Sequence, residues 1–499
     1  MGLKSFLSRP LAAYTVHQYR KWALHPEAAQ QRILQNLVQQ GTATAFGHAH
    51  GLADVRTVTD FQQRVPVRDY EALSAYFERV KVGERDVLWP GRPLYLAKTS
   101  GTTSGTKYIP ITEASIANHI NGAKDALLHY IHHSGKPQFL DGRLMFLSGS
   151  PELEQVGGIK TGRLSGISNH HVPAYLRRNQ LPSYATNCIE DWEQKLDRIV
   201  EETLGQPMSL ISGIPPWVQM YFDRLTQRTG RPVGEVFPAF QLFVYGGVNF
   251  EPYRRKLFDS IGRPVDTLEL FPASEGFFAF QDQPDNPGLL LLADAGIYYE
   301  FIPAERFFEP NPPRLTLAEV ELDKNYALVV SSNAGLWGYS VGDTVRFVSL
   351  RPHRVVVSGR IKHFLSAFGE HVIGEEVEQT LREVLQQFPE AEVVEFTVAP
   401  RVSETETEPS RHEWLVEFAR PPEDAAAFAA ALDAGLRRRN VYYDDLLAGN
   451  ILAPLLLTSL PAGAFQRYMK SQGKLGGQNK VPRLSNDRGL AEGLVGQIL

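Results

Sequence analysis

Residues 99–107 carry the clearest chemical signal in the sequence, because hydroxyl side chains and glycines there lead to a lysine. The order is T-S-G-T-T-S-G-T-K, so Gly101 and Gly105 interrupt a run of serine and threonine that ends at Lys107. Glycine lets the backbone come close to a ligand. Successive backbone N–H groups can form an anion-binding concavity, and hydroxyls add further donors. Because Lys107 adds a positive charge, we expect this stretch to bind the oxygens of a phosphate group.

The same stretch differs from a Walker A loop, which has the pattern G-x-x-x-x-G-K-[ST] and opens a helix. Here Thr106 separates Gly105 from Lys107, and the alternating residues 108–111 predict that a strand follows. Residues 94–97 predict a strand before it, so the stretch is expected to be a loop between two strands. A solvated Ser/Thr/Gly hairpin is the alternative, but the lysine and the many donors together favour phosphate binding.

Further downstream, short apolar runs are each followed by a turn or an irregular polar connection. These runs are residues 143–148, 208–213, 242–247 and 265–271. Repeated strand–turn–helix units in this order indicate a parallel α/β sheet. Ligands collect beyond the carboxyl ends of the strands in such sheets. We therefore expect the turns at 212–217, 245–248 and 271–276 to lie at that edge.

The chain is long enough for two domains, because single cores stop growing at about 250–300 residues and this chain has 499. The expected fold class is α/β. Residues 1–357 predict a large N-terminal α/β domain, in which short strands between 288 and 348 build a β subdomain. Residues 358–499 predict a smaller α+β domain.

The composition excludes several classes of protein. A formal charge of −5 argues against a nucleic-acid binder, which would usually be basic. Cys188 is the only cysteine, which excludes an internal disulfide and suits the cytoplasm. No apolar run approaches the ~20 residues needed to span a bilayer, so we expect no membrane insertion. The basic segment before Glu27 predicts an amphipathic helix packed on the protein, and a monomer is favoured.

The sequence of residues 99–107 resembles the phosphate-binding loop of the adenylate-forming superfamily, which includes acyl-CoA synthetases, adenylation domains and luciferases. Its second Ser-Gly pair is closer to one branch, the auxin-responsive Gretchen Hagen family of acyl acid–amido synthetases, known from plants. We expect a bacterial relative of that family. The resemblance implies that Lys107 is catalytic and that the loop binds ATP. The ATP-binding loop residues implied are Thr99, Ser100, Gly101, Thr102, Thr103, Ser104 and Gly105.

Residues 271–275, F-P-A-S-E, resemble the superfamily motif aromatic-x-x-[Ser/Thr]-Glu. The resemblance implies that Phe271 stacks on adenine, that Ser274 contacts the α-phosphate and that Glu275 holds Mg²⁺ and is catalytic. A carboxylate beside phosphate oxygens is a ligand that Mg²⁺ prefers. This sequence has Phe271 where tyrosine is usual and Pro272 where glycine is common, which changes the hydroxyl contact and the turn.

Residues 245–248, Y-G-G-V, resemble the glycine-rich turn that lines the adenine and acyl pockets. The resemblance implies that Gly246 and Gly247 contact the nucleotide. The implied acyl-pocket residues are Trp217, Tyr245 and Val248. An ordinary turn after a strand explains the glycine pair equally well.

Three further motifs complete the resemblance. Residues 339–343, Y-S-V-G-D, resemble Tyr-x-x-Gly-Asp, which implies that Asp343 binds both ribose hydroxyls. Residues 358–362 resemble a hinge motif, in which Arg360 reaches the ribose or phosphate and Lys362 absorbs the movement of a mobile C-terminal domain. Residues 477–483 resemble the C-terminal motif of the amido synthetases, which implies that Lys480 is catalytic. Lys470 and Lys474 are nearby alternatives to Lys480.

The resemblance implies an enzyme that uses ATP and Mg²⁺ to convert a carboxylic acid into an acyl-adenylate. It then transfers the acyl group to the amine of an amino acid. An acid–CoA ligase working through the same intermediate is the alternative within the superfamily. A non-catalytic ATP-binding protein is the alternative outside enzymes, although Glu275, Asp343, Arg360 and Lys480 together argue against it.

Overall fold

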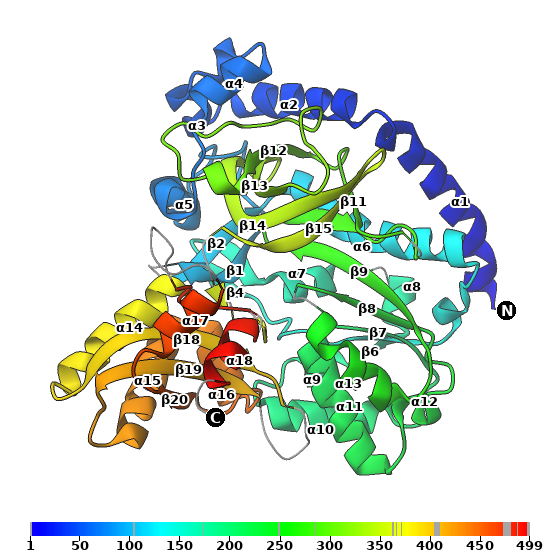
Figure 1. The fold of residues 1–499 in the computed structure, drawn as a ribbon. Coiled ribbons are helices and arrows are strands. Elements are labelled where there is room, and N and C mark those ends of the chain that lie inside the picture. The colour runs from blue at the N-terminus through cyan, green and yellow to red at the C-terminus, as the bar shows by residue number, and fades with distance from the viewer. Residues whose placement is uncertain are drawn as a thin grey trace. The chain divides into compact units, whose positions relative to one another are not determined.

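The computed structural model describes residues 2–102, 105–172, 174–247, 250–284, 286–361, 364–365, 367–370, 372–403, 410–472, 481–486 and 488–496. The chain divides into two compact units (Figure 1). The larger unit consists of Met1–Thr99, Lys107–Ile189 and Lys195–Ile361, and the smaller unit of Ser100–Thr106, Glu190–Gln194 and Lys362–Leu499. Sheets and helices are mixed throughout, so the predicted α/β fold class is confirmed.

The larger unit is built on a sheet that has eleven strands in the described part of the chain. Its order is β12-β13-β14-β15-β11-β10-β9-β8-β7-β3-β6. The parallel strands are β6 (Gln180–Leu181), β3 (Arg143–Phe146), β7 (Met208–Ser212), β8 (Leu242–Gly246) and β9 (Asp266–Ala273). Four of them are the apolar runs predicted from the sequence. Leu210, Phe243 and Leu268 are buried, as expected for parallel strands covered on both faces.

The other half of this sheet is antiparallel. Its strands are β10 (Gly276–Phe280), β11 (Leu289–Leu291), β15 (His353–Arg360), β14 (Leu336–Leu350), β13 (Asn325–Ser332) and β12 (Ile297–Pro303). They include the strands expected in a β subdomain, and here they continue the parallel strands in a single sheet. Outside these strands, an isolated bridge joins Leu315 to Phe301 of β12.

Residues 95–102 and 105–111 form two strands of a second sheet, which has four strands in the described part of the chain. The sheet order is β2 (Gly105–Ile111), β1 (Tyr95–Thr102), β5 (Ile159–Arg163) and β4 (Glu154–Val156). The strands extend further toward each other than the sequence predicted. The threonines at 99, 102 and 106 explain the difference, because β-branched residues favour extended backbone.

Helices precede and follow strands β1 and β2 in the chain. Before β1 lie α1 (Leu3–Ala23), α2 (Pro26–Gly41), α3 (Ala45–Ala49), α4 (Val58–Arg64) and α5 (Ser74–Lys81). After β2 come α6 (Glu113–Ser134), α7 (Leu164–His170), α8 (Ala174–Arg177), α9 (Tyr184–Asn187), α10 (Trp192–Thr203), α11 (Pro215–Thr229), α12 (Val233–Val236) and α13 (Glu251–Ile261). Thr112 caps α6 and Thr57 caps α4, and each side chain accepts a hydrogen bond from a backbone N–H.

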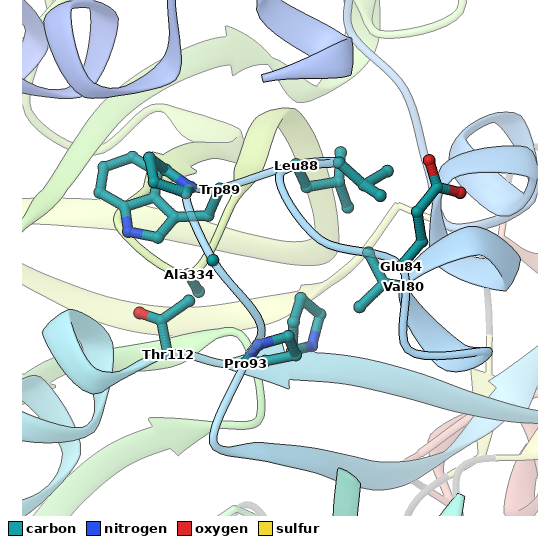
Figure 2. Close-up of a pocket in the computed structure, with 11 residues that line it drawn as sticks. Val80, Glu84, Leu88, Trp89, Pro93, Thr112 and Ala334 are labelled. Carbon is teal, nitrogen blue, oxygen red and sulfur yellow. The ribbon is translucent and has the colours of Figure 1, made fainter. Parts of the chain in front are cut away.

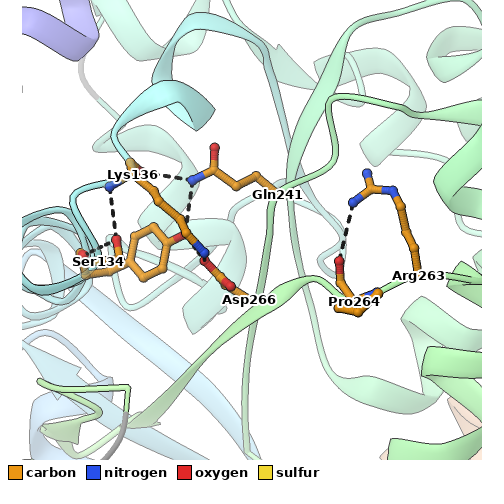
Figure 3. Close-up of polar contacts among 7 residues, drawn as sticks. Ser134, Lys136, Gln241, Arg263, Pro264 and Asp266 are labelled. Carbon is orange, nitrogen blue, oxygen red and sulfur yellow. Dashed lines mark hydrogen bonds and ion pairs between the residues drawn. The ribbon is translucent and has the colours of Figure 1, made fainter.

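A polar network fixes α6 to the beginnings of strands β8 and β9 (Figure 3). The carboxylate of Asp266, the first residue of β9, accepts hydrogen bonds at 2.6 Å from both the Tyr130 hydroxyl and Lys136 Nζ. Gln241 Nε2 donates to the Tyr130 hydroxyl at 3.0 Å and to the Lys136 carbonyl at 2.9 Å. Burial and then the Asp266 carboxylate raise the pKa of Tyr130, so it remains a donor. The network stabilises the amino ends of these strands.

The smaller unit is α+β. Its main sheet contains β18 (Glu392–Arg401), β19 (Arg411–Arg420) and β20 (Leu456–Leu460). Two short strands, β16 (Phe364–Leu365) and β17 (Val372–Ile373), pair separately. Its helices are α14 (Gly374–Gln387), α15 (Ala425–Arg439), α16 (Val441–Ala448), α17 (Ala464–Ser471) and α18 (Gly489–Val495). Trp414, Phe428 and Tyr443 are fully buried in its core.

Helix α1 packs on α6, but not with the side that its sequence suggests. Its buried positions are small or medium-sized residues, namely Ser5, Ser8, Ala12, Val16 and Ala23. Its large apolar side chains, including Phe6 and Leu7, are exposed. In the part of the chain that the structure describes, no helix has the length and apolar character needed to cross a membrane.

Candidate active site

The carboxyl ends of β7, β8 and β9 lie at one edge of the large sheet. The parallel register aligns Ser212 with Val244 and Gly246 with Leu270. The described residues of the predicted turns, 212–217, 245–247 and 271–276, lie at or just after the ends of these three strands, so they share an edge. Figure 1 shows the three strands side by side in the sheet.

The glycine pair after β8 is required by the packing of the backbone. A Cβ on Gly246 would lie 2.3 Å from the carbonyl oxygen of Leu270 on the neighbouring strand. Gly247 has a φ of +83°, which favours glycine. The close approach of β9 explains Gly246, and the left-handed backbone explains Gly247. Contact with a nucleotide is not needed to explain them.

Ser274 and Glu275 form the turn of a tight hairpin between β9 and β10. Ala273 pairs with Gly276 across this turn, so two residues separate the strands. Phe271 is buried, and its ring packs edge-to-face against Phe278 at a centroid distance of 5.2 Å. Ser274 is half-buried, and Glu275 is 9 % exposed. The hairpin therefore holds a carboxylate at the edge where β7, β8 and β9 end.

Tyr339 connects this hairpin to strand β14. Its hydroxyl donates a hydrogen bond to Glu275 Oε1 at 3.3 Å. Burial, and then the charge of Glu275, raise the pKa of Tyr339 well above its ordinary value, so the phenol stays protonated. A phenol that keeps its proton can donate a hydrogen bond to a carboxylate oxygen. The contact joins two sequence motifs that lie 64 residues apart.

Asp343 lies four residues after Tyr339, inside β14. The strand is irregular there, and Gly342 adopts a φ of +89°. Asp343 is buried and pairs in register with Arg360 of β15. The Ile361 N–H also donates to the Gly342 carbonyl at 2.9 Å. The Tyr-x-x-Gly-Asp motif and the beginning of the hinge motif are therefore neighbours in the sheet.

Aromatic packing links the end of the phosphate-loop stretch to Tyr339. Lys107 Nζ lies 5.7 Å from the centre of the Tyr70 ring, within cation–π range. The Tyr70 hydroxyl accepts a hydrogen bond from the Tyr108 N–H at 3.0 Å. Tyr70 stacks on Phe77 at 4.5 Å, and Phe77 lies edge-to-face against Tyr339 at 6.4 Å. These contacts connect Lys107 to the Tyr339–Glu275 pair through buried rings.

Sequence reasoning gave no role to Tyr70, Phe77 or the phenol of Tyr339. In the structure, the Arg68 N–H donates to the Gly338 carbonyl at 3.0 Å, and the Ser340 N–H donates to the Arg68 carbonyl at 2.8 Å. The signal that could have identified them is the repeated tyrosine, once before the loop and once in the Tyr-x-x-Gly-Asp motif.

The remaining predicted residues are only partly described. Thr99 is half-buried near the end of β1, Trp217 is half-buried in the first turn of α11, and Tyr245 is buried against Phe243 and Phe250. The backbones of Ser100, Gly101, Thr102, Gly105 and Arg360 belong to strands, and their side chains are not described. The predicted residues that lie outside the described residues are Thr103, Ser104, Val248, Lys362 and Lys480.

A small cavity of about 10 Å³ lies elsewhere in the larger unit, lined by residues that include Leu88, Trp89, Pro93 and Thr112 (Figure 2). A volume of this size holds roughly one water molecule. None of the predicted site residues lines it. The cavity is therefore not a substrate pocket.

The residues at the sheet edge could bind a magnesium ion only if a nucleotide supplied further ligands to the same ion. Among the described residues, no group of three or more His, Cys, Asp or Glu side chains could hold a metal ion. Glu275 offers one carboxylate, and its Oε1 already accepts from Tyr339. Mg²⁺ is commonly held by one or two carboxylates together with phosphate oxygens and water. The donor set thus suits Mg²⁺ bound with nucleotide phosphates.

Three models of one family match separate parts of the chain. They are the GH3 family N-terminal domain at residues 15–171, the GH3 family central domain at 290–360 and the GH3 family C-terminal domain at 375–489. This chain belongs to the GH3 family. The predicted resemblance is therefore confirmed at the level of the family.

Named GH3 relatives are distant in sequence. Jasmonoyl–L-amino acid synthetase JAR4 of Nicotiana attenuata is 21 % identical over 386 residues, which cover 64 % of this chain and 66 % of that protein. Jasmonoyl–L-amino acid synthetase GH3.5 of Oryza sativa subsp. japonica is 28 % identical over 49 % of this chain and 45 % of its own length. Both matches span less than two thirds of the relative. Indole-3-acetic acid-amido synthetase GH3.4 of Arabidopsis thaliana is 21 % identical, with 97 % of this chain and 94 % of that protein covered.

Two solved structures share the fold. The AtGH3.15 acyl acid amido synthetase in complex with 2,4-DB superposes with a TM-score of 0.60 at 17 % identity and covers 97 % of this chain and 96 % of its own. The 2-hydroxyisobutyryl-CoA ligase in its thioesterification state gives 0.58 at 15 % identity and covers 95 % and 91 %. The GH3 fold of this chain is thus shared by an amido synthetase and a CoA ligase.

Proposed function

We propose that this GH3 protein joins a carboxylic acid to ATP and passes the acyl group to the amine of an amino acid. The products are an amide, AMP and pyrophosphate. The observation that most supports this is the hydrogen bond from Tyr339 to Glu275 at 3.3 Å. This hydrogen bond joins the Glu275 carboxylate to the Tyr-x-x-Gly-Asp motif. The aromatic contacts of Tyr70 and Phe77 then connect Tyr339 to Lys107. Membership of the GH3 family supports the same reaction.

In the first step, a carboxylate oxygen of the acid attacks the α-phosphorus and pyrophosphate leaves. The developing negative charge on the phosphates is the main obstacle, and fixed cations and N–H groups are the means to offset it. Mg²⁺ bound by Glu275 would neutralise phosphate charge there. Lys107 supplies a second positive charge, and residues 99–105 supply hydroxyl and N–H donors.

The nucleotide itself would be held near the turn after β9 and the Tyr339–Asp343 segment of β14, which the Tyr339–Glu275 hydrogen bond connects. Asp343 is the proposed ligand of the ribose, because one carboxylate can accept from two hydroxyls. Arg360, its register partner in β15, is proposed to contact the ribose or phosphate. Phe271 and Ser274 are proposed at the adenine and the α-phosphate, with Gly246 and Gly247 beside the base. Tyr339 positions Glu275 and does not touch the reacting atoms.

In the second step, the amine attacks the carbonyl carbon of the acyl-adenylate. The bond from that carbon to the bridging oxygen breaks, AMP leaves with the oxygen, and the nitrogen loses a proton. The enzyme forms no covalent intermediate in this scheme. Trp217, Tyr245 and Val248 are the proposed acyl-pocket residues. Residues 358–499 are proposed as a mobile lid that turns at Lys362 and supplies Lys480 for the first step.

A CoA thiol instead of an amine is the second candidate nucleophile. The observation that favours considering it is the fold shared with 2-hydroxyisobutyryl-CoA ligase at a TM-score of 0.58. The two candidates share the acyl-adenylate and differ only in the acceptor. Family membership favours the amine. A reducing location such as the cytoplasm suits either enzyme, since Cys188 is the only cysteine.

The experiment that tests the proposal measures pyrophosphate release from ATP and Mg²⁺ over a panel of carboxylic acids. The panel includes indole-3-acetic acid, jasmonic acid and 2,4-DB, each with amino acids or with CoA. We expect pyrophosphate and AMP with at least one acid, and an amide with at least one amino acid. ADP and orthophosphate as products would overturn the adenylation step. A thioester without any amide would replace the amine by CoA.

A further inference from the structure

Helix α1 displays its large apolar side chains to solvent. Leu3, Phe6, Leu7 and Tyr14 are 73, 63, 56 and 62 % exposed, and Leu11 is 51 % exposed. Their spacings of three, four and seven residues place them along one side of a helix. The opposite side, with Ser5, Ser8, Ala12 and Val16, is buried against the larger unit. We call the five exposed residues the outer face of α1.

The orientation of α1 is fixed by polar contacts at both ends. The Gly2 N–H and the Ser5 hydroxyl each donate to Asp141 Oδ2 at 2.7 Å. Toward the other end, the Tyr19 hydroxyl donates to Asp125 at 3.0 Å. These contacts oppose rolling of the helix, so the outer face is a stable feature of the fold. Contiguous apolar surface of this kind marks an interaction site.

The charge of this segment is opposite to that of the rest of the protein. Residues 1–26 contain Lys4, Arg9, Arg20 and Lys21 and no aspartate or glutamate. The segment therefore carries +4 while the whole chain carries −5, which leaves −9 on the remaining residues. Arg9, Arg20 and Lys21 are exposed. A surface that fits this helix must accept apolar side chains and carry negative charge.

We propose that the outer face of α1 docks on an anionic lipid membrane, with the helix lying in the plane of the interface. Surface helices that present apolar side chains together with lysine and arginine bind in this way, with the apolar side chains in the headgroup and acyl boundary. Negative lipid headgroups attract each nearby lysine or arginine by ~1 kcal/mol. A second copy of the chain fits less well, because two outer faces would bring basic residues together with no acid in α1 to offset them. The protein would bind one leaflet without crossing it.

Vesicle cosedimentation tests the proposal with the full chain. Vesicles of phosphatidylglycerol and phosphatidylcholine in equal parts are compared with vesicles of phosphatidylcholine alone. We expect binding to the anionic vesicles that weakens as salt rises. Phe6→Ser should reduce the partition coefficient about tenfold or more, because a buried phenylalanine contributes ~1.5–3 kcal/mol. Lys21→Gln should reduce it about fivefold, the ratio that ~1 kcal/mol per basic residue gives.

Two matched controls separate this face from general surface effects. Phe308→Ser removes a phenylalanine that is 72 % exposed elsewhere in the larger unit, and Arg228→Gln removes an exposed charge on α11. Neither should change partitioning, and far-ultraviolet circular dichroism should be the same for all variants. Leu11→Ser repeats the test if Phe6→Ser does not fold.

Three results would overturn the proposal. The first is no binding to anionic vesicles at low salt. The second is a loss of vesicle binding in the Phe308→Ser control that is as large as the loss in Phe6→Ser. The third is a dimer in sedimentation velocity that Phe6→Ser converts to a monomer, because the outer face would then pair with a second copy of the chain.

Discussion

The hydroxyl of Tyr339 lies 3.3 Å from Glu275 Oε1 and donates a hydrogen bond to it. Tyr339 is completely buried in β14, and Glu275 sits in the two-residue turn between β9 and β10. The contact therefore fixes the hairpin relative to a strand that also carries Asp343. This pair is the structural link between the proposed magnesium ligand and the proposed ribose ligand.

Replacing Tyr339 by phenylalanine should slow the proposed adenylation without unfolding the protein. The change removes one hydrogen bond to a charged group, for which a net contribution of about 1.5–3 kcal/mol is typical. We expect pyrophosphate release to fall about tenfold, which corresponds to ~1.4 kcal/mol. Steady-state assays with the most active acid of the panel measure this.

Tyr299→Phe is the matched control. Tyr299 is as deeply buried as Tyr339, but its hydroxyl has no hydrogen-bond partner among the described residues. Its replacement should leave pyrophosphate release unchanged. Equal loss of activity in both variants would show that the effect of Tyr339→Phe comes from core packing and not from Glu275.

Glu275→Gln separates the charge of this side chain from its shape. Glutamine can still accept a hydrogen bond from Tyr339, so the melting temperature should change little. Loss of a preorganised charged contact at a transition state costs ~10²–10³ in rate, and we expect that loss in pyrophosphate release.

Glu300→Gln provides the contrast, because Glu300 is buried in an ion pair with Arg314 at 2.5 Å. Breaking that pair should lower the melting temperature, while activity per folded molecule persists. Normal activity of Glu275→Gln would contradict the assigned role.

Gly246→Ala should destabilise the larger unit through a steric clash. The new Cβ would lie 2.3 Å from the Leu270 carbonyl oxygen, and backbone cannot move aside as a flexible side chain can. We expect a loss of about 3 kcal/mol, at the upper end of overpacking effects. Gly205→Ala is the control, because it has a φ of +75° and no atom within 4 Å of its Cβ position. It should cost only the ~1–2 kcal/mol of left-handed backbone. Thermal unfolding compares the two variants, and equal losses would contradict the clash.

His129 should make the protein less stable as the pH falls below 6.5. Burial lowers the pKa of His129 to about 3, and neither ring nitrogen has a hydrogen-bond partner among the described residues. Between pH 6.5 and about 3 the unfolded chain binds a proton that the folded protein does not. The free energy of unfolding therefore decreases as the pH decreases, by about 1.4 kcal/mol per pH unit for this group.

The variant His129→Phe should reduce that pH dependence. Unfolding midpoints between pH 7 and pH 4.5 measure the slope for the wild type and the variant. His48→Phe is the control, because His48 is exposed in α3 and should leave the slope unchanged. An unchanged slope in His129→Phe would mean that His129 is protonated in the folded protein.

The part of the site that follows local rules could be predicted from the sequence. Apolar runs that end in glycine, proline or serine indicated β7, β8 and β9, and a parallel sheet necessarily brings their carboxyl ends to one edge. The positions of Gly246 and Glu275 at that edge follow from this pattern.

The contacts between distant segments could not be predicted in this way. The continuation of β9 into antiparallel strands depends on partners far along the chain, so the Tyr339–Glu275 hydrogen bond has no local signal. The pairing of Asp343 with Arg360 likewise depends on how β14 and β15 align, and no local pattern in the sequence fixes that register. In α1, the large apolar residues suggested the packed side, whereas close contact with α6 selects small residues.

The central claim is that the acid is activated as an acyl-adenylate and then captured by an amine. Mass spectrometry of the products from an acid labelled with ¹⁸O in its carboxylate tests this most directly. A carboxylate oxygen that attacks the α-phosphorus stays with that phosphorus when the amine attacks the carbonyl carbon. The account predicts one ¹⁸O atom in AMP, unlabelled pyrophosphate and an acid–amino acid amide. Labelled orthophosphate together with ADP, or AMP without label, would contradict it.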